Sequence, residues 1–405
     1  MNNVIFTICA KNYLAQALSL RESVLKHNSV DFRIFLADDA GGLDIPDLVG
    51  LDDAWIPGWR SMAFKYDVVE FNTSIKPFCI RKLFDDGYDK VVYLDPDIFV
   101  VRPLDYVFDN LDRYSVILTP HRCEMLQDYE GAISEETCLH VGIYNLGFVA
   151  LRNDAIGRRL ADWWCRRLAD KCYIEMNEAL FVDQKWMNFI PGFFPEQVLI
   201  SRHLGLNTAL WNLQEREVLY EDGSYKVRSR CDADHTDPLV FFHFSGYSPH
   251  VPDRIDKRDE SLTVQSNPEF KALVSAYCEC ELRNGYERYS TMQYSFNVFN
   301  NGEVILPLHR RLYRCHEQEF QGVDNPFDAS AAVYARLQSN RLILHAQPAA
   351  AVDTRTADVR QREEVKLHRW LRLFLKVAGV RRYALLLRAC HKVSIFENHS
   401  FLLDE

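Results

Sequence analysis

Several signatures of specialised protein classes are missing from this chain of 405 residues. No apolar run reaches the roughly 18 residues that a membrane-spanning helix needs, and the apolar stretch at the amino terminus is too short for a signal peptide. The eleven cysteines form no CxxC pair, and Cys278 and Cys280 have no second pair at zinc-ligand spacing. We therefore expect reduced thiols in a cytoplasmic protein.

Charge and size narrow the class further. The formal net charge of −10 is not that of a general nucleic-acid binder, so no nucleic-acid partner is expected. With 48% apolar residues, the chain can bury one large α/β domain with appendages, or two domains. This composition excludes a chain that is disordered throughout.

The first forty residues predict a βαβ unit, with a strand at 4–9, a helix at 14–25 and a strand at 32–36. Such a unit implies a parallel sheet and a ligand site outside the carboxyl ends of its strands. The same patterns predict strands at 91–94, 116–119, 144–151 and 239–244, and helices at 77–84 and 155–172. The predicted fold class is α/β.

Two carboxylates, Asp95 and Asp97, follow the apolar strand that begins at Val91. An ionised carboxylate is costly to bury unpaired, so the pair indicates a bound cation. Oxygen ligands favour Mg²⁺ or Mn²⁺, ions that proteins usually share with substrate phosphates. The alternative is an ordinary turn, because Asp and Pro also end strands for local reasons.

The end of the first strand is a candidate nucleoside site. Backbone groups there can pair with a pyrimidine edge, and an aromatic ring can stack on the base; the residues are Thr7, Ile8, Cys9, Ala10 and Tyr13. The alternative is simple strand and helix-start chemistry.

A series of separated motifs then gives the chain a resemblance to a family. In chain order they are Tyr93-Leu94-Asp95-Pro96-Asp97, Asn145-Leu146-Gly147, Asp183-Gln184, Leu204-Gly205-Leu206-Asn207 with Asn212, and His243-Phe244-Ser245-Gly246. This ordered set resembles nucleotide-sugar glycosyltransferases of the GT-A fold, closest to the retaining family-8 type and its bacterial relatives. The resemblance covers roughly residues 1–250.

The resemblance implies a fold and a division of the chain. The fold would be GT-A, a Rossmann-like, mixed and mainly parallel sheet flanked by helices, with a helical C-terminal extension. Residues 1–250 would form the catalytic domain, 251–330 an α-rich extension that completes it and contributes to the acceptor site, and 331–405 a connector with a basic helical tail.

The resemblance also implies roles for residues. His243 would join Asp95 and Asp97 as the third metal ligand, and its imidazole favours Mn²⁺ over Mg²⁺. The catalytic candidates are Asp183, Gln184 and Asn145; Asp183 would bind sugar hydroxyls and Gln184 would lie near the anomeric carbon. Besides the first-strand residues, the donor-binding candidates are Asn72, Lys76, Tyr93, Leu94, Asp95 and Gly246. Without the companion motifs, His243 would be an ordinary core histidine, and Asp183 and Gln184 could lie on a surface helix.

One departure concerns the phosphate contact. Family-8 proteins usually continue the last motif as Lys-Pro-Trp, with the lysine on the donor diphosphate, but this chain continues Tyr247-Ser248-Pro249-His250. Lys76 is our candidate replacement, followed by Lys257 and Arg254.

The tail differs in charge from the rest of the chain. Between Arg355 and Lys392 there are eleven Lys and Arg against three acids. Leu367, Trp370 and Phe374 recur at helical spacing among these charges, which predicts a basic amphipathic helix. Such a helix can bind an anionic membrane surface at the inner face of the plasma membrane, or dock on its own domain.

The sequence thus predicts a metal-dependent glycosyltransferase, with a nucleoside-diphosphate sugar, expected to be a UDP-sugar, as donor. A hydroxyl of a glycan or lipid-linked molecule would be the acceptor, and bacterial surface-polysaccharide assembly is the expected setting. Two alternatives remain: a haloacid-dehalogenase-type phosphatase, which also uses Asp-x-Asp with Mg²⁺, and a nucleotide-sugar-binding protein without catalysis.

Overall fold

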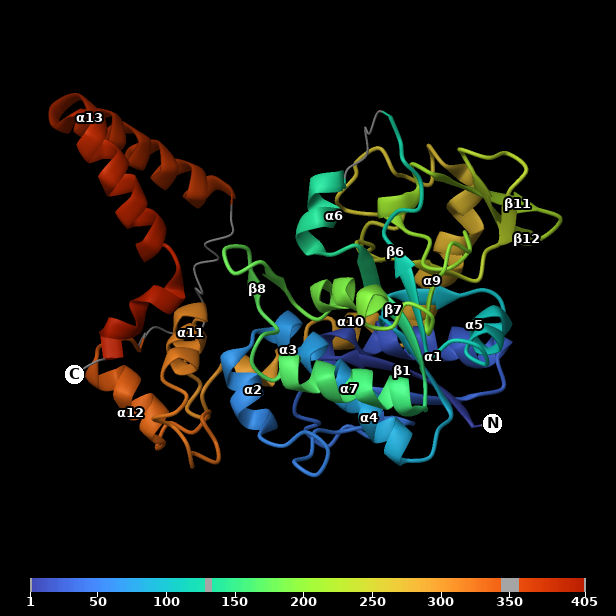
Figure 1. The fold of residues 1–405 in the computed structure, drawn as a ribbon, viewed down its shortest axis with the longest axis horizontal. Coiled ribbons are helices and arrows are strands. Elements are labelled where there is room, and N and C mark those ends of the chain that lie inside the picture. Colours follow the sequence, from blue (N-terminus) through green and yellow to red (C-terminus); the bar gives the residue numbers. More distant parts are fainter. Residues whose placement is uncertain (1, 128–132, 344–356, 404–405) are drawn as a thin grey trace. The chain divides into compact units, whose positions relative to one another are not determined.

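The computed structural model describes residues 2–127, 133–343 and 357–403. The first part of the chain contains a seven-stranded sheet (Figure 1). Strand β7 is antiparallel to both of its neighbours, and all other neighbours are parallel. The strand order confirms the predicted α/β class with a mixed, mainly parallel sheet. In spatial order the strands are β10 (Val198–Ile200), β6 (Val116–Pro120), β7 (Tyr144–Arg152), β4 (Lys90–Leu94), β1 (Asn3–Cys9), β2 (Asp31–Leu36) and β3 (Leu48–Val49).

The chain divides into two compact units. Unit 1 comprises Met1–Trp59 and Val68–Tyr294, and unit 2 comprises Arg60–Asp67 and Ser295–Glu405. The predicted domains 1–250, 251–330 and 331–405 describe roles along the sequence and stay predictions. All eleven cysteines are free thiols. Of the helices in the described part of the chain, none combines the length and apolar character that a membrane span needs.

The central strands of unit 1 are buried along nearly their whole length, so both faces of the sheet need covering layers. Helix α1 (Leu14–His27) packs on a buried face of the sheet that includes Ile5, Ile34 and Val92. Helices α4 (Lys76–Asp85) and α7 (Ala155–Leu168) pack against each other. Asp154 caps the amino terminus of helix α7, because its carboxylate accepts hydrogen bonds from the N–H groups of Ile156 and Gly157. These strands and helices lie where the sequence predicts them.

A small second sheet carries the last predicted strand. Strands β5 (Ile98–Val100) and β14 (Phe241–His243) pair antiparallel, with His243 opposite Ile98. Phe244 continues this pairing, because its N–H donates to the carbonyl of Asp97 at 2.8 Å. The pairing brings the end of β14 beside the turn that follows β4.

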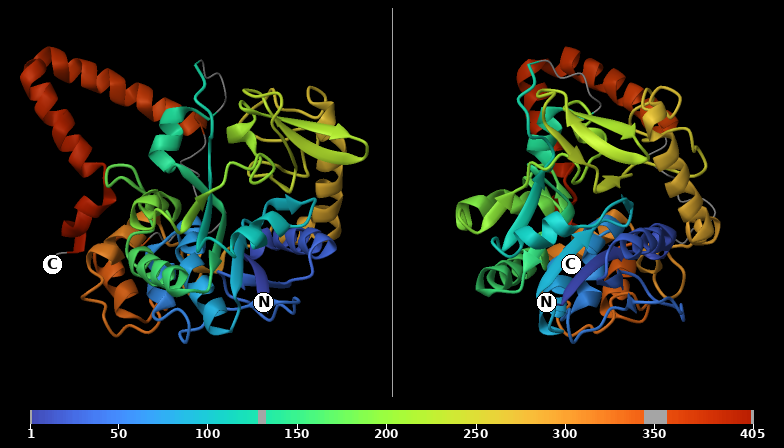
Figure 2. Two further views of the ribbon diagram at one scale, coloured as in Figure 1. Left: turned by 45° about the vertical axis from the view of Figure 1, so that its right-hand side comes forward. Right: turned by 90° about the vertical axis from the view of Figure 1, so that its right-hand side faces the viewer.

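The other elements of unit 1 surround this framework. A three-stranded sheet, yellow-green in Figure 2, stands apart from the blue strands β1 and β2 and consists of β11 (Arg216–Glu221), β12 (Ser224–Ser229) and β13 (Thr236–Pro238). The remaining elements are η1 (Lys11–Tyr13), α3 (Val68–Ser74), α5 (Asp105–Asn110), α6 (Glu135–Val141), β8 (Ile174–Glu175), β9 (Leu180–Phe181), η2 (Gln184–Phe189), α8 (Ile190–Phe193), η3 (Leu210–Asn212), η4 (Pro268–Phe270), α9 (Lys271–Arg283) and α10 (Tyr286–Tyr289).

Unit 2 is helical, as predicted for the C-terminal extension. Its helices are α2 (Trp59–Lys65, from Arg60 on), α11 (Pro307–Cys315), α12 (Ala332–Ser339), α13 (Ala357–Val393) and η7 (Phe396–Leu403). The buried Arg310 of α11 donates to the carbonyls of Ala63, Phe64 and Tyr66, which ties the end of α2 to α11.

The connector predicted at the start of 331–405 is partly helical. It contains α12, whose Val333 and Leu337 are buried, and residues 344–356 lie outside the described part. The tail is helical as predicted, although Gly379, at φ 77° and ψ 163°, interrupts α13. Trp370 and Phe374, four residues apart, stack with ring centroids 5.5 Å apart.

Candidate functional site

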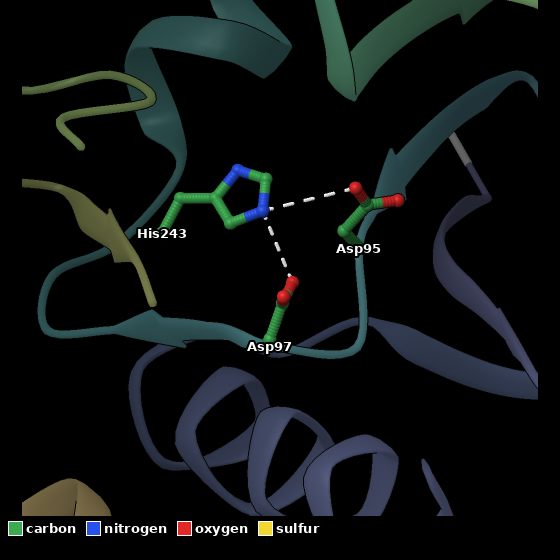
Figure 3. Close-up of side chains that lie close together, drawn as sticks. All are labelled: Asp95, Asp97 and His243. Atoms are coloured by element: carbon green, nitrogen blue, oxygen red, sulfur yellow. Dashed lines mark ion pairs between the residues drawn. The ribbon is translucent and has the colours of Figure 1, made fainter. Parts of the chain in front are cut away.

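The three predicted metal ligands lie together (Figure 3). Asp95 follows β4, Asp97 precedes β5, and His243 ends β14. His243 Nε2 lies 3.0 Å from Asp97 Oδ1 and 3.8 Å from Asp95 Oδ2. One potential donor atom from each residue lies within 4.8 Å of the other two. Two carboxylates and one imidazole within this range can hold a divalent cation.

The hydrogen bonding around these atoms tests whether a cation fits. Asp97 Oδ1 is buried and makes no hydrogen bond to any described residue, while His243 Nε2 lies 3.0 Å from it. Tyr93, on the preceding strand β4, fixes the Asp95 carboxylate, because its hydroxyl donates to Asp95 Oδ1 at 2.5 Å. A buried acceptor that the protein leaves unpaired fits a site built for an added cation.

The far side of the imidazole fixes its tautomer. His243 Nδ1 lies 3.1 Å from Asn207 Oδ1. The amide nitrogen of Asn207 donates to Asn145 Oδ1 and to Thr119 Oγ1, each at 3.0 Å, so the amide oxygen must face the ring. Nδ1 therefore carries the proton in the neutral ring, and the lone pair of Nε2 points to the two aspartates. This is the arrangement that a metal-binding histidine needs.

A fourth side chain extends the network. Asn145 Nδ2 donates to His121 Nε2 at 3.3 Å, and His121 Nδ1 lies 3.2 Å from the carbonyl of Ile143. Burial lowers the pKa of His121 to about 4, so its ring is neutral near pH 7 and can accept on one nitrogen while it donates from the other. The chain His121, Asn145, Asn207 and His243 orients the metal ligand from outside the site.

Gly147 makes room for the same ligand. A Cβ added to Gly147 would lie 2.4 Å from His243 Cε1 and 2.7 Å from its Nδ1. Real Cβ atoms do not approach other atoms so closely. The glycine of the Asn-x-Gly motif thus supplies space, and the asparagine of the same motif supplies orientation.

The charges of the three ligands are coupled. Burial raises the pKa of Asp95, and the nearby Lys76 and His243 only partly offset this effect. Burial also opposes ionisation of Asp97, but His243 outweighs it and the pKa of Asp97 is lowered. Burial opposes protonation of His243, yet Asp97 and Asp95 raise its pKa. A metal ion therefore competes with a proton for His243.

A cavity of about 220 Å³ opens beside these ligands. Tyr13, 44% exposed, gives it an aromatic wall, and the buried Oδ1 of Asn72 has no hydrogen-bond partner among the described residues. The predicted residues that line the cavity are Ile8, Cys9, Ala10, Tyr13, Asn72, Tyr93, Asp95 and Asp97. The structure thus brings together the carboxyl ends of β1 and β4 with α3, as a donor site at this edge of the sheet requires.

Other donor-site candidates lie outside the cavity lining. Thr7 and Leu94 are fully buried, and Gly246 packs against Asp256. Lys76, 1% exposed, donates to Asp183 Oδ2 at 2.5 Å and to the carbonyl of Leu146 at 2.8 Å. Since an ammonium group has three donors, two of those of Lys76 are engaged inside the protein.

The catalytic candidates surround that ion pair. Burial raises the pKa of Asp183, although Lys76 opposes the shift. Gln184 Nε2 donates to the carbonyl of Val141 at 3.0 Å, and its Oε1 accepts from the N–H of Leu146 at 3.4 Å. Gln184 thus joins η2, α6 and β7 just beyond the metal ligands. Asn145, the third candidate, orients Asn207 in the histidine network.

Sequence reasoning assigned no role to three residues of this region. Asn207 stood in a motif but without a function, and nothing in the sequence singled out His121. Arg258, two residues after Asp256, donates to Ser245 Oγ, close to the metal ligand His243. The additional candidates Lys257 and Arg254 lie on the same loop, where Arg254 Nη2 donates to the carbonyl of Lys257 at 2.8 Å.

The curated proteins that resemble this chain are distant in sequence. No protein-family model matches the chain. The chain is 26% identical over 183 residues to the uncharacterized protein YfnF of Bacillus subtilis strain 168, covering 45% of this chain and 58% of that protein. It is 27% identical over 186 residues to the uncharacterized protein YfnD of the same organism, with 44% and 54% covered. The chain therefore spans little more than half the length of these relatives.

Solved structures also show distant likenesses. Galactosyltransferase LgtC, in complex with donor and acceptor sugar analogues, is 16% identical with a TM-score of 0.39, over 67% of this chain and 95% of LgtC. Mouse xyloside xylosyltransferase 1 is 13% identical with a TM-score of 0.35, over 52% and 88%. The bifunctional glycosyltransferase WbbM is 14% identical with a TM-score of 0.39, over 72% and 52%. All three names are those of glycosyltransferases, the class that the ordered motifs resemble, but at these TM-scores the likenesses decide neither activity nor substrate.

Proposed function

We propose that this protein is a metal-dependent glycosyltransferase that uses a nucleoside-diphosphate sugar, a UDP-sugar in our reading, as donor. The observation that carries the proposal is the cluster of Asp95, Asp97 and His243 at the edge of a cavity formed by the ends of β1 and β4. A cation site next to a cavity with an aromatic wall matches the two halves of a nucleoside diphosphate.

Each part of the site has a task in this proposal. Tyr13 stacks on the base, and the backbone of Ile8 to Ala10 with Asn72 binds its polar edge. Asp95, Asp97 and His243 hold Mn²⁺ or Mg²⁺, which when bound acts as a Lewis acid on the leaving diphosphate. Asp183, positioned by Lys76, accepts hydrogen bonds from the sugar.

We propose retention of anomeric configuration. In a retaining route by front-face attack, the bond from the anomeric carbon to the diphosphate oxygen breaks and a bond to the acceptor oxygen forms on the same face. The acceptor proton passes to an oxygen of the leaving diphosphate, so no catalytic base is needed. Gln184 is our candidate for the residue near the anomeric carbon, and its amide is held at both ends.

A phosphatase of the haloacid-dehalogenase type is not favoured. In that class the first aspartate of the motif is the nucleophile, and the motif normally opens the domain. Here Asp95 follows the fourth strand of the chain, its Oδ1 accepts the Tyr93 hydroxyl, and His243 completes the donor set.

The test combines binding with turnover. UDP-sugars should raise the melting temperature of the full chain only when Mn²⁺ is present, because the proposed site binds the diphosphate through the metal. The increase should be measurable, since a ligand at 100 times its Kd adds about 2.7 kcal/mol to the free energy of unfolding. Asp97→Asn should keep the melting temperature without ligand, yet lose the Mn²⁺-dependent increase and sugar transfer. Full transfer by Asp97→Asn in metal-depleted buffer would refute the assigned role. The anomeric configuration of the product, read by NMR, tests retention.

The setting is part of the same proposal: a cytoplasmic enzyme that adds sugars to glycan or lipid-linked acceptors of a bacterial surface polysaccharide. Exposed apolar side chains on α13, including Leu367 at 53% and Trp370 at 52%, alternate with Arg369 and Arg372, which suits an anionic membrane surface. Removal of residues 354–405 should weaken binding to phosphatidylserine vesicles in a sedimentation assay, and unchanged binding would remove the membrane role.

A further inference from the structure

The loop after β14 brings a guanidinium group to the metal site. Arg258 Nη2 donates to Ser245 Oγ, and Ser245 lies two residues beyond His243. The backbone between them is anchored to the site, because the N–H of Phe244 donates to the carbonyl of Asp97 at 2.8 Å. The positive charge of Arg258 contributes to lowering the pKa of Asp97 and opposes protonation of His243.

The charge balance of the site calls for such a cation. Two ionised aspartates already neutralise a divalent ion, so the charge of a diphosphate needs a further positive group. Lys76 and Arg258 each pair with a carboxylate at 2.5 Å, Asp183 and Asp256, but the side chain of Lys76 is 1% exposed and that of Arg258 37%. Lys11 lies 3.7 Å from Asp38. Arg254 pairs with Glu260 at 3.6 Å.

Arg258 is held so that one of its terminal nitrogens stays available. Its Nε donates to Asp256 Oδ1 at 2.9 Å, and its Nη2 donates to Asp256 Oδ2 at 2.5 Å and to Ser245 Oγ. Nη1 makes no hydrogen bond to any described residue, and the side chain is 37% exposed. Asp256 and Ser245 thus orient the guanidinium and leave the two N–H groups of Nη1 for a ligand.

Gly246 makes this arrangement possible. A Cβ on Gly246 would lie 2.3 Å from Asp256 Oδ1 and 2.5 Å from its Cγ, so only glycine leaves space for the carboxylate. The N–H of Lys257 donates to the carbonyl of Gly246 at 3.0 Å, which fixes the loop beside β14. The glycine of His-x-x-Gly thus serves Asp256 and, through it, Arg258.

We propose that Arg258 binds the diphosphate of the donor, with Asp256 as its positioning residue. The inference rests on the proposed function and adds a residue that sequence reasoning did not select. Arginine suits this task because its guanidinium stays charged and the two N–H groups of Nη1 can each donate a charge-assisted hydrogen bond to a phosphate oxygen. Under this proposal Arg258 makes the phosphate contact for which Lys76, Lys257 and Arg254 were the candidates.

The test compares UDP with uridine, each titrated calorimetrically into the full chain with MnCl₂. Arg258→Gln should weaken UDP binding by about 10-fold to 100-fold, since it removes charge-assisted hydrogen bonds, and leave uridine binding unchanged. Lys271→Gln, which removes one positive charge from an exposed position of α9, is the matched control and should bind UDP as the wild type does. Gly246→Ala, which displaces Asp256, should show the same selective loss as Arg258→Gln.

The outcomes separate this inference from the proposed function. A wild-type chain that binds UDP with Mn²⁺ while Arg258→Gln binds it equally well overturns the inference alone. Equal losses for UDP and uridine in Arg258→Gln assign Arg258 a structural role and also overturn it. A wild-type chain that binds no nucleotide with Mn²⁺ removes the proposed function and this inference with it.

Discussion

Gly147→Ala tests the architecture of the metal site without touching a ligand. The new Cβ would lie 2.4 Å from His243 Cε1, whereas ordinary contacts begin at 3.4 Å, so ring and strand must separate by about 1 Å. Metal ligands keep their function only within about 0.5 Å of the required geometry. The substitution should therefore displace His243 from the two aspartates.

The substitution should lower both the metal affinity and the free energy of unfolding. Displacement of the ring weakens its 3.1 Å hydrogen bond to Asn207, and loss of such outer contacts typically lowers metal affinity by about 10-fold to 100-fold. Overpacking at a buried site costs about 1–3 kcal/mol of the free energy of unfolding. Since folded domains have about 5–15 kcal/mol in total, most of the variant should remain folded at 25 °C.

The assay is Mn²⁺ titration followed by electron paramagnetic resonance of the free ion, with saturating UDP and with melting curves recorded in parallel. Gly192→Ala is the matched control, because nothing lies within 4 Å of the added Cβ in helix α8. The control should keep the Mn²⁺ affinity and lose no stability. A folded Gly147→Ala that binds Mn²⁺ as tightly as the wild type would refute the argument that His243 needs this space.

Two further predictions concern buried groups around the site. His121 has a pKa of about 4 in the folded chain against about 6.5 unfolded, so the unfolded state takes up a proton first as the pH falls and stability drops by about 3 kcal/mol between pH 6.5 and 4. His121→Gln should remove that share of the pH dependence in urea unfolding, and identical wild-type and variant curves would contradict the burial argument. Lys76→Met should cost about 3–5 kcal/mol because it leaves Asp183, 2% exposed, without its partner. The double variant Lys76→Met with Asp183→Asn should regain most of that stability in thermal unfolding, and a double variant no more stable than the single one would argue against the pair as the cause.

The two aspartates could be predicted from the sequence because they have a local reason. Asp95 and Asp97 follow a strand of continuous apolar residues, where a carboxylate pair has few structural roles. His243 was selected only through the family resemblance, because a histidine in an apolar stretch is otherwise an ordinary core residue. The βαβ pattern at the amino terminus then fixed the edge of the sheet at which ligands bind, and the cavity lies there.

Partners inside the fold could not be predicted in the same way. Lys76 was selected as a cation near the donor, but its partner Asp183 lies 107 residues further along the chain. Whether a lysine meets a phosphate or a buried carboxylate depends on side-chain packing that no periodicity encodes. The helix α12, within a stretch expected to be a connector, was missed because its eight residues form only about two turns among Ala-rich and polar sequence.

The motif residues that are not ligands show where the sequence signal comes from. Gly147 and Gly246 provide space for His243 and Asp256, and Asn207 with Asn145 sets the ring orientation. Their identity is constrained because the space holds no Cβ and because a side-chain amide can accept from the ring with its oxygen and donate from its nitrogen. A lysine that contacts phosphate is constrained by its charge, and a guanidinium from another loop position can meet the same need. This difference explains how the chain can keep the glycines and asparagines of the motifs if, as proposed above, Arg258 makes the phosphate contact.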